Sequence, residues 1–393
     1  MVIQKKLSIL GCRGIPGNHG GFETFAQRLA LSLIERDWAI TVYCENYERP
    51  DTHEEIWKGV RLIHIPVPHS SAKSTILFDW KSTLHAAREN TLVLTLGYNT
   101  AIFSLLYRLK GIPNLINMDG LEWKRQKWNF AQRAWLYINE RLGCWFGNHL
   151  IADHPVIADH LATRVPRTKI TTIPYGADPI KAADEALIEP YGLMKNEYAI
   201  VIARPEPENN ILEIVSAFST RRRGLKLVVL GNYYPSENDY HRQVIAAASD
   251  EVIFTGGIYD QPVVEALRTY AQLYIHGHAV GGTNPSLVEA MAASSPILAH
   301  DNAFTRWVAG KEARFFADTQ SCSDQFDHLL NNTAALESMG CYSLQRYEEA
   351  FSADQELFAY EDLFISTIER FGLQAVETDR LTVETPLVTT PKH

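Results

Sequence analysis

Cysteine is scarce in this sequence. Its five cysteines, among 393 residues, are scattered from Cys12 to Cys341 and form no CxxC pair. Such a set supplies neither a disulfide framework nor a zinc site, and it is typical of proteins in a reducing cytosol. We therefore expect a cytoplasmic protein.

Positive charge and long apolar runs are also in short supply. Lys and Arg number 37 against 46 Asp and Glu, a formal charge of −9, whereas a nucleic-acid-binding protein needs a basic face. One uncharged window of 18 residues, 90–107, contains Gly97, Asn99 and three threonines. Its composition favours a strand, a turn and a helix over a membrane span. The apolar run at the amino terminus is too short for a signal peptide.

What the sequence does contain is an alternation of short apolar runs with amphipathic segments. The runs predict strands at residues 7–12, 39–44, 60–65, 92–96, 114–118, 150–152 and 170–174, and then at 198–203, 225–230, 252–255, 273–276, 297–299 and 313–316. Strands that alternate with helices form parallel sheets with right-handed crossovers. We therefore predict an α/β fold of two Rossmann-like, doubly wound domains that face a cleft.

Composition shifts suggest the domain boundaries. We predict one domain over residues 1–178, an acidic, proline-containing linker over 179–195, and a second domain over 196–360. Residues 361–393 are predicted to form a terminal helix that packs back toward the first domain, followed by a loose polar tail.

A glycine-rich loop follows the first predicted strand. It contains five glycines in residues 11–21, among them the adjacent Gly20 and Gly21, and it leads into a helical pattern. Glycines let the backbone approach a bulky anion, and a helix amino terminus adds N–H donors and partial positive charge. Neither GxGxxG nor GxxxxGK[ST] is present, so a nicotinamide site and a P-loop are not indicated. The alternative is a loop whose glycines serve only tight turns.

A second loop of this kind precedes the helical pattern at 285–294. Asn284 is a favoured N-cap residue and Pro285 suits the first helical position. Glu289 lies five residues beyond Asn284, or about 7 Å along a helix at ~1.5 Å per residue. That distance suits a helix that binds a diphosphate at its end and a ribose with its carboxylate. The predicted ligand contacts here are Gly282, Thr283, Asn284, Pro285, Ser286 and Glu289. The alternative is that Glu289 is an ordinary solvated glutamate on a helix surface.

These motifs resemble the group 1 glycosyltransferases, also called glycosyltransferase family 4, which are retaining enzymes of the GT-B fold. The resemblance extends from the first loop to about residue 371, and its strongest pieces are RGIPGNHGGFE, IPYGAD, ARPEPENN and GGTNPSLVEAMA. It is most similar to a bacterial branch that includes rhamnosyltransferases of surface-polysaccharide assembly. The resemblance implies a nucleotide-sugar donor and a saccharide acceptor, which in that branch is lipid-linked.

The resemblance also assigns roles to individual residues. Glu289 matches the second glutamate of an E-x7-E element that holds the donor ribose, and residues 282–284 match those that hold the diphosphate. Arg204 matches an arginine that grips the phosphates, and Gly20 and Gly21 match the paired glycines of the amino-terminal loop.

Three positions depart from the family pattern. Gly281 replaces the first glutamate of E-x7-E, Asn209 replaces a lysine near the phosphates, and Met118 falls where a histidine often faces the 6-hydroxyl of the sugar. A methionine packs well against a methyl group. We therefore favour a 6-deoxy sugar such as L-rhamnose, carried on dTDP. The alternative is that Met118 belongs to the core.

Cleavage of the donor leaves charge on the departing diphosphate, which preorganised donors must stabilise. Arg204 and the two glycine loops are predicted to do this. No DxD triplet occurs, so we expect neither a metal nor another cofactor. Asp119 and His278 are the candidates to contact the sugar or the acceptor. The alternatives are a structural turn aspartate and a buried, hydrogen-bonded histidine.

Two further segments have candidate roles. Residues 123–146 mix cations with aromatic side chains, a composition that suits peripheral contact with the inner face of a membrane. The alternative is a helix with core tryptophans and a solvated basic end. Ile258 and Tyr259, in a turn after a predicted strand, are candidates to contact the nucleobase.

Two other functions remain open. A nucleotide-sugar epimerase can share this architecture, although epimerases usually carry more carboxylates in the cleft. A catalytically degenerate transferase domain that only binds a partner is suggested by Gly281 and Asn209. The presence of Glu289, Arg204 and both glycine loops argues against it.

Overall fold

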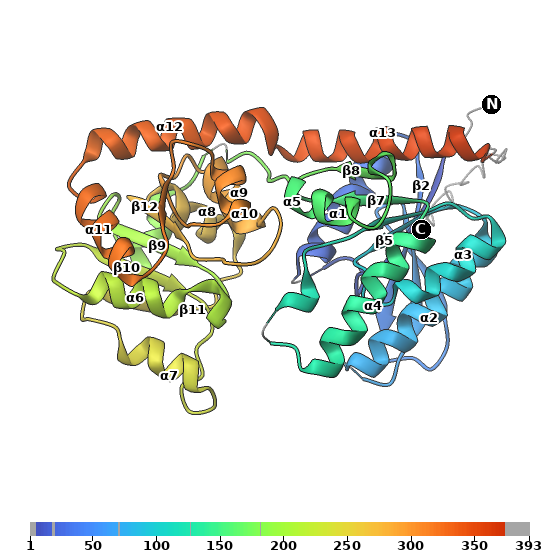
Figure 1. The fold of residues 1–393 in the computed structure, drawn as a ribbon, viewed down its shortest axis with the longest axis horizontal. Coiled ribbons are helices and arrows are strands. Elements are labelled where there is room, and N and C mark those ends of the chain that lie inside the picture. Colours follow the sequence, from blue (N-terminus) through green and yellow to red (C-terminus); the bar gives the residue numbers. More distant parts are fainter. Residues whose placement is uncertain (1–4, 18–19, 70, 126, 181, 374–393) are drawn as a thin grey trace, which may run out of the picture. The chain divides into compact units, whose positions relative to one another are not determined.

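The computed structural model describes residues 5–17, 20–69, 71–125, 127–180 and 182–373 (Figure 1). The polar tail predicted at the carboxyl terminus lies outside these residues, as do Asn18 and His19 of the first glycine loop. The chain divides into two compact units, one comprising Leu94–Phe364 and the other the residues before and after this range. Among the described residues, no helix combines the length and apolar character that a bilayer-spanning segment needs.

The first sheet has eight strands in the order β3-β4-β2-β1-β5-β6-β7-β8. The pairings β1–β2, β2–β4, β6–β7 and β7–β8 are parallel, whereas β3 and β4 are antiparallel. The strands are β1 (Lys6–Leu10), β2 (Ala39–Asn46), β3 (His53–Trp57), β4 (Val60–Pro66), β5 (Leu92–Leu96), β6 (Asn114–Asn117), β7 (His149–Ala152) and β8 (Ile170–Thr172). The helices of this part are α1 (Gly21–Ile34), α2 (Ala72–Glu89), α3 (Ser104–Lys110), α4 (Phe130–Phe146) and α5 (Pro155–Ala162), with short 3-10 turns η1 (Ala101–Phe103), η2 (Glu122–Lys124) and η3 (Arg167–Lys169).

The second sheet has six parallel strands in the order β11-β10-β9-β12-β13-β14. This is the order of a doubly wound nucleotide-binding sheet, which reverses between its first and fourth strands. The strands are β9 (Tyr198–Ile202), β10 (Lys226–Leu230), β11 (Val252–Gly256), β12 (Leu273–His276), β13 (Ile297–His300) and β14 (Arg314–Phe316). The helices are α6 (Ile211–Ser219), α7 (Asp239–Ala246), α8 (Gln261–Thr269), α9 (Pro285–Ala292), α10 (Ala303–Ala309), α11 (Thr319–Leu329), α12 (Thr333–Ala350) and α13 (Ala353–Phe371), with 3-10 turns η4 (Glu185–Tyr191) and η5 (Pro207–Asn209).

The predicted fold class, two Rossmann-like α/β domains with parallel sheets, is therefore confirmed. The inner strands are covered on both faces, and for this reason they read as continuous apolar runs. The uncharged window at 90–107 forms β5, η1 and the start of α3, as the sequence predicts.

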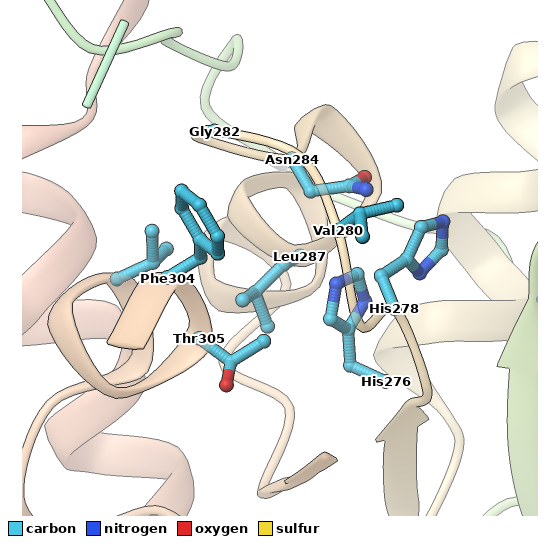
Figure 2. Close-up of a pocket in the computed structure, with 9 residues that line it drawn as sticks. His276, His278, Val280, Gly282, Asn284, Leu287, Phe304 and Thr305 are labelled. Atoms are coloured by element: carbon cyan, nitrogen blue, oxygen red, sulfur yellow. The ribbon is translucent and has the colours of Figure 1, made fainter. Parts of the chain in front are cut away.

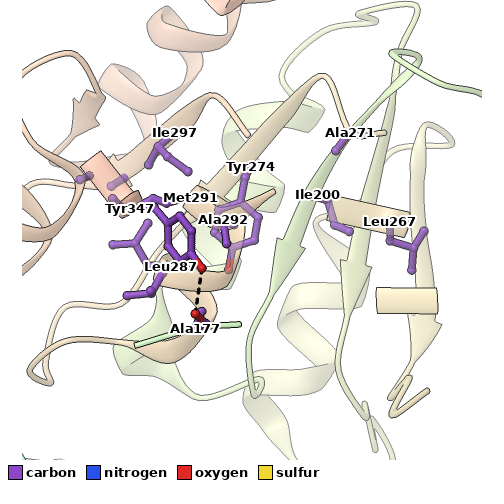
Figure 3. Packing of buried hydrophobic residues seen from close by; sticks show 14 of the residues in the cluster. Ala177, Ile200, Leu267, Ala271, Tyr274, Leu287, Met291, Ala292, Ile297 and Tyr347 are labelled. Atoms are coloured by element: carbon purple, nitrogen blue, oxygen red, sulfur yellow. Dashed lines mark hydrogen bonds between the residues drawn. The ribbon is translucent and has the colours of Figure 1, made fainter. Parts of the chain in front are cut away.

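The core of the second sheet includes residues from outside that sheet. Ile188 of η4 and Ala177 are buried in it, beside Tyr198, Tyr274 and Tyr347. The Tyr347 hydroxyl donates to the Ala177 carbonyl at 2.9 Å (Figure 3). The segment predicted as a linker therefore contains a 3-10 turn that packs into a core; the domain boundaries themselves stay a prediction.

The helical segment at 343–371 is divided between two helices. The break falls at Phe351 and Ser352, where the Phe351 carbonyl accepts from the Ala177 N–H at 3.0 Å and the Ala177 carbonyl accepts from the Ala353 N–H at 2.9 Å. A Cβ on Gly176 would lie 2.6 Å from the Ser352 carbonyl oxygen. Glycine is therefore needed for this close approach.

Candidate functional site

The loop between β12 and α9 forms a capped helix start, as the sequence predicts. The Asn284 side chain accepts a hydrogen bond from the Ser286 N–H at 3.2 Å, and Pro285 occupies the first turn of α9. The cap satisfies one of the N–H groups that a helix start leaves without an intrahelical partner. It thereby fixes the path of the glycine loop that precedes it.

A pocket lies beside this loop (Figure 2). It brings together three predicted site residues, His278, Gly282 and Asn284. Its other lining residues, which come from β12, the loop, α9 and α10, were not among the predicted site residues: His276, Val280, Leu287, Phe304, Thr305 and Val308. Figure 2 shows the rings of His276 and His278 beside each other, with Phe304 across the pocket. No motif in the sequence points to α10.

The two pocket histidines are stacked and neutral. Their ring centroids are 4.3 Å apart and the rings are nearly parallel. Burial, with the nearby charges of Arg125 and Arg204, lowers the pKa of His278 to about 3. Burial also places the pKa of His276 well below its ordinary value. Nδ1 of His278 and both ring nitrogens of His276 are buried without a hydrogen-bond partner among the described residues.

An aspartate that sequence reasoning missed contacts the predicted phosphate loop. The Thr283 N–H donates to Oδ2 of Asp153 at 2.9 Å, and the Thr283 hydroxyl donates to the Asp153 carbonyl at 2.5 Å. A Cβ on Gly282 would lie 2.1 Å from the Asp153 carboxylate oxygens. Burial, and then the charge of Asp119, raise the pKa of Asp153 to about 7. The signal was its position directly after β7, at the carboxyl end of a parallel strand.

Asp119 lies close to the same loop. Its backbone is left-handed, at φ 49°, and its N–H donates to Oδ1 of Asn117 at 2.9 Å. Burial and the charge of Glu122 raise its pKa. The next residue, Gly120, approaches the Gly281 backbone so closely that a Cβ on Gly120 would lie 3.5 Å from the Gly281 Cα. The structure therefore brings Asp119, Asp153 and residues 281–283 together.

Glu289 is anchored by a buried cation. Its carboxylate forms an ion pair with the guanidinium of Arg268 on α8, whose side chain is only 3% exposed. The pairing of Glu289 with a buried partner differs from the simple alternative of a solvated helix glutamate. No motif identifies Arg268 in the sequence, because it lies on an amphipathic helix 21 residues before Glu289.

Three cations gather near His278. The charges of Arg125 and Arg204 both help lower its pKa, after burial. The same two charges, again after burial, lower the pKa of Lys127. Arg125 is also paired with Glu122 at 2.5 Å and with Glu208 at 3.3 Å. The Arg204 guanidinium forms no hydrogen bond or ion pair with any residue that the structure describes, so its charge remains available to an anion.

Asn209 serves the loop around Arg204. It is buried, and its amide donates to the Arg204 carbonyl at 2.8 Å. Its own carbonyl packs so closely on Gly277 that a Cβ there would lie 2.0 Å away. Because this amide N–H bonds to the protein backbone, the structure gives Asn209 a role in shaping the loop around Arg204.

Met118 is a core residue in this structure. It is 1% exposed and belongs to a hydrophobic cluster with Tyr98, Leu136 and Cys144. Its thioether packs against Gly143, where a Cβ would lie 3.5 Å from the sulfur. This burial agrees with the alternative interpretation of Met118 as core, and it removes the structural basis for a contact with the C6 methyl of a donor sugar.

Gly20 and Gly21 belong to the other compact unit. Gly20 has φ +128°, and a Cβ there would clash with the Glu23 carboxylate, which also accepts from the Arg13 N–H at 3.0 Å. A Cβ on Gly21 would meet nothing within 4 Å. The positive φ therefore explains why residue 20 is a glycine. At position 21, open space would accommodate a larger side chain.

Ile258 and Tyr259 follow β11. Ile258 packs against the core of the second sheet, whereas Tyr259 is exposed and its hydroxyl accepts from the Asn232 amide at 3.2 Å. Of the two, Tyr259 has the accessible ring that a base contact requires.

The described residues contain no cluster of three or more His, Cys, Asp or Glu side chains arranged to hold a metal ion. The expectation of a metal-free reaction stays a prediction.

Two families match the chain. Residues 4–178 match a domain of unknown function, DUF1972, and residues 184–346 match the glycosyl transferases group 1. No curated protein sequence matches the chain.

Similar solved structures share its fold at low sequence identity. Sucrose-phosphate synthase from Thermosynechococcus elongatus has a TM-score of 0.78 at 16% identity, over 93% of this chain and 100% of that one. The Anabaena protein Alr3699/HepE in complex with UDP has a TM-score of 0.72 at 13% identity, over 92% and 100%. A trehalose 6-phosphate synthase from Burkholderia multivorans has a TM-score of 0.71 at 10% identity, over 97% and 100%. Residues 184–346 are therefore similar to the group 1 glycosyltransferases, and the chain has the fold of GT-B glycosyltransferase structures.

Proposed function

We propose that this chain is a retaining glycosyltransferase that moves a sugar from a nucleotide-sugar donor onto a saccharide acceptor. The observation that carries the proposal is Glu289, held by the buried Arg268 on a helix whose start is capped by Asn284. This helix lies in the segment that matches the group 1 family. Its carboxylate is suited to the ribose hydroxyls, and the loop before it to the diphosphate.

The cations near His278 supply what the leaving group needs. When the anomeric C–O bond breaks, negative charge develops on the diphosphate, and fixed positive charge lowers the barrier. Arg204 takes this role. Arg125 and Lys127 are further cations near His278, in a site where Asn209 stands at the position of the family's lysine. We propose that the departing phosphate oxygen accepts the proton of the acceptor hydroxyl, which attacks from the same face of the sugar.

No side chain is then required as a general base. His278 is neutral at physiological pH and carries an unpartnered ring nitrogen, which suits a hydrogen bond to a sugar hydroxyl. Asp119, which lies beside residues 281–283, suits the same kind of contact, because its carboxyl oxygens can accept a hydrogen bond from a sugar hydroxyl.

The donor and acceptor rest on sequence resemblance. dTDP-L-rhamnose is the proposed donor, and a lipid-linked saccharide of cell-surface polysaccharide assembly is the proposed acceptor, without a metal cofactor. The burial of Met118 leaves the rhamnosyl assignment without support from the site. Alr3699/HepE forms complexes with UDP, with UDP and glucose, and with UDP-glucose. A UDP-sugar is therefore the competing candidate for the donor of this chain.

Binding of nucleotides tests the proposal. The full chain is heated with dTDP, UDP or GDP, each alone and as its sugar, with EDTA or with Mg²⁺. A ligand at 100 times its Kd stabilises the folded state by about 2.7 kcal/mol, so the preferred base should raise the Tm most. Glu289→Ala should abolish the preference, whereas the exposed Glu312→Ala serves as the matched control.

The outcomes separate the alternatives. A shift with dTDP and dTDP-rhamnose supports the rhamnosyl donor, and a shift with UDP or GDP replaces it while the transferase remains. A free epimeric sugar nucleotide formed without acceptor would indicate an epimerase. If no nucleotide shifts the Tm, the chain is a degenerate, non-catalytic binding protein.

A further inference from the structure

The outer side of α4 is unusually apolar for a surface helix. Its inner side packs in the core through Leu136 and Cys144. On the opposite side, Phe130 is 88% exposed, Ile138 52% and Trp145 56%. At about 100° per residue, the spacings of eight and seven residues place these three side chains within an arc of roughly 80° on one side of the helix. We call them, with Arg141 between them, the α4 outer face.

The apolar surface continues onto the neighbouring segment. Helix α3 packs beside α4 (Figure 1). Leu109 of α3 is 76% exposed, and Ile102 and Leu105 are also exposed. Contiguous exposed apolar side chains of this kind mark an interaction site, because a monomer gains nothing from leaving them in water.

Charge on this surface is of one sign. Within residues 101–146 the sequence has seven cations, Arg108, Lys110, Lys124, Arg125, Lys127, Arg133 and Arg141, and three acids, Asp119, Glu122 and Glu140. Glu122 and Glu140 are buried, and Glu140 is paired with Arg164 and His160. The α4 outer face therefore has no acidic side chain, although the chain as a whole carries a charge of −9.

Trp123 and Trp128, at the start of this segment, form hydrogen bonds inside the protein. Trp123 Nε1 donates to Glu140 at 2.5 Å, and Trp128 Nε1 donates to Glu122 at 3.3 Å. Both indoles are thus tied to buried carboxylates. Of the exposed aromatic residues of α4, Phe130 and Trp145 are the most exposed, ahead of Trp135 at 40% and Tyr137 at 39%.

We propose that the α4 outer face, together with Leu105 and Leu109 of α3, binds the surface of a lipid bilayer that contains anionic lipid. A helix with an apolar face and flanking cations lies in the plane of the headgroups, with its side chains ~5–10 Å into the acyl boundary. Anionic headgroups complement Arg108, Lys110, Arg133 and Arg141. A second copy of the chain fits less well, because a twofold contact would bring the same cations together. Nucleic acid offers no apolar phase for the exposed rings and leucines.

Vesicle co-sedimentation of the full chain tests this surface. Phosphatidylcholine vesicles are compared with vesicles that also contain phosphatidylglycerol, at low and high salt. Wild type should bind the anionic vesicles, and Ile138→Glu or Trp145→Glu should each weaken binding by about tenfold or more, because a charge must then enter the acyl boundary. Arg108→Gln and Lys110→Gln should each weaken it by about fivefold. Met194→Glu, at a side chain 62% exposed elsewhere, is the matched control.

Two further measurements on each variant separate a loss of vesicle binding from other effects. The Tm of each variant and its shift with nucleotide should equal those of wild type, which separates lost binding from lost folding and from the proposed transferase activity. The proposal is overturned if wild type binds neither kind of vesicle, or if the α4 variants bind as well as Met194→Glu. Concentration-dependent dimerisation of wild type that Ile138→Glu abolishes, without vesicle binding, would assign the surface to a second copy instead.

Discussion

Asp153 illustrates how one side chain can depend on contacts far along the chain. Its carboxylate accepts from the N–H of Thr283, 130 residues away, and lies against Gly282. Removing this carboxylate from water disfavours its charged form. The site therefore contains an acid that titrates near neutrality.

This titration predicts a pH-dependent stability. The pKa of Asp153 rises from 3.8 to about 7 on folding. Its stabilising effect is therefore complete below pH ~4 and is lost as the pH rises to 7. Three pKa units correspond to at most about 4 kcal/mol. Asp153→Asn should gain free energy of unfolding relative to wild type between pH 4 and 7, and then stay constant, in urea titrations. A wild-type-to-variant difference that is independent of pH would contradict this.

Glu289 and Arg268 make a second prediction at this scale. Glu289→Ala leaves a buried guanidinium without its partner, so we expect a loss of about 1–3 kcal/mol of unfolding free energy and loss of nucleotide binding. Glu289→Gln should restore most of the stability, because its amide oxygen still accepts from Arg268, but little of the binding. Calorimetric titration and urea unfolding of the two variants separate the effects. Equal nucleotide affinity in Glu289→Ala and wild type would remove Glu289 from the site.

At the scale of elements, the start of α9 combines two functions. Asn284 caps the helix and also lines the pocket. Asn332 caps α12, where its side chain accepts a hydrogen bond from the Ala335 N–H at 3.1 Å, and it has no predicted ligand role. The two caps form a matched pair.

Asn284→Ala and Asn332→Ala should each cost about 1 kcal/mol of unfolding free energy, the usual value of an N-cap. Only Asn284→Ala should also weaken nucleotide binding, because only its loop is predicted to hold the diphosphate. Parallel urea and binding measurements compare them. A similar loss of affinity in both variants would show a general effect of destabilisation.

The accuracy of the sequence interpretation also varied by element. The longer apolar runs and the capped start of α9 were predictable, since each depends on neighbours within a few residues. The helices α7, α8 and α10 were missed, whereas α9, of similar length, was predicted because Asn284 and Pro285 mark its start. Strand β3 was missed as well, because an exposed edge strand with the sequence HEEIW has few apolar residues.

At the scale of the whole molecule, the chain and the proposed nucleotide-sugar donor are both negatively charged. Within a chain of charge −9, Arg204 is a cation without an acidic partner among the described residues, whereas Arg125 is paired with Glu122 and Glu208, and Lys127 lies 3.9 Å from Glu122. Exposed charges are screened over about 10 Å at 0.1 M salt. The local cations, rather than the net charge, are therefore expected to govern binding.

Nucleoside diphosphate affinity should then fall as salt increases. Arg204→Gln should reduce the affinity by about tenfold, since a charge-assisted hydrogen bond contributes about 1.5–3 kcal/mol, and it should flatten the salt dependence. Arg222→Gln, at an exposed arginine paired with Asp250, is the control. Affinity that is unchanged by salt and by Arg204→Gln would place the diphosphate elsewhere.

The sequence alone determined the α/β alternation, the doubly wound class and the cap of α9, because hydrophobic period and capping chemistry are properties of neighbouring residues. Only the tertiary structure decided that Met118 is core, that Arg268 holds Glu289, and that Asp153 meets Thr283. Each of these pairs residues that are distant in sequence. Their contacts depend on the order of the strands and the packing of helices, and a local pattern carries no record of either.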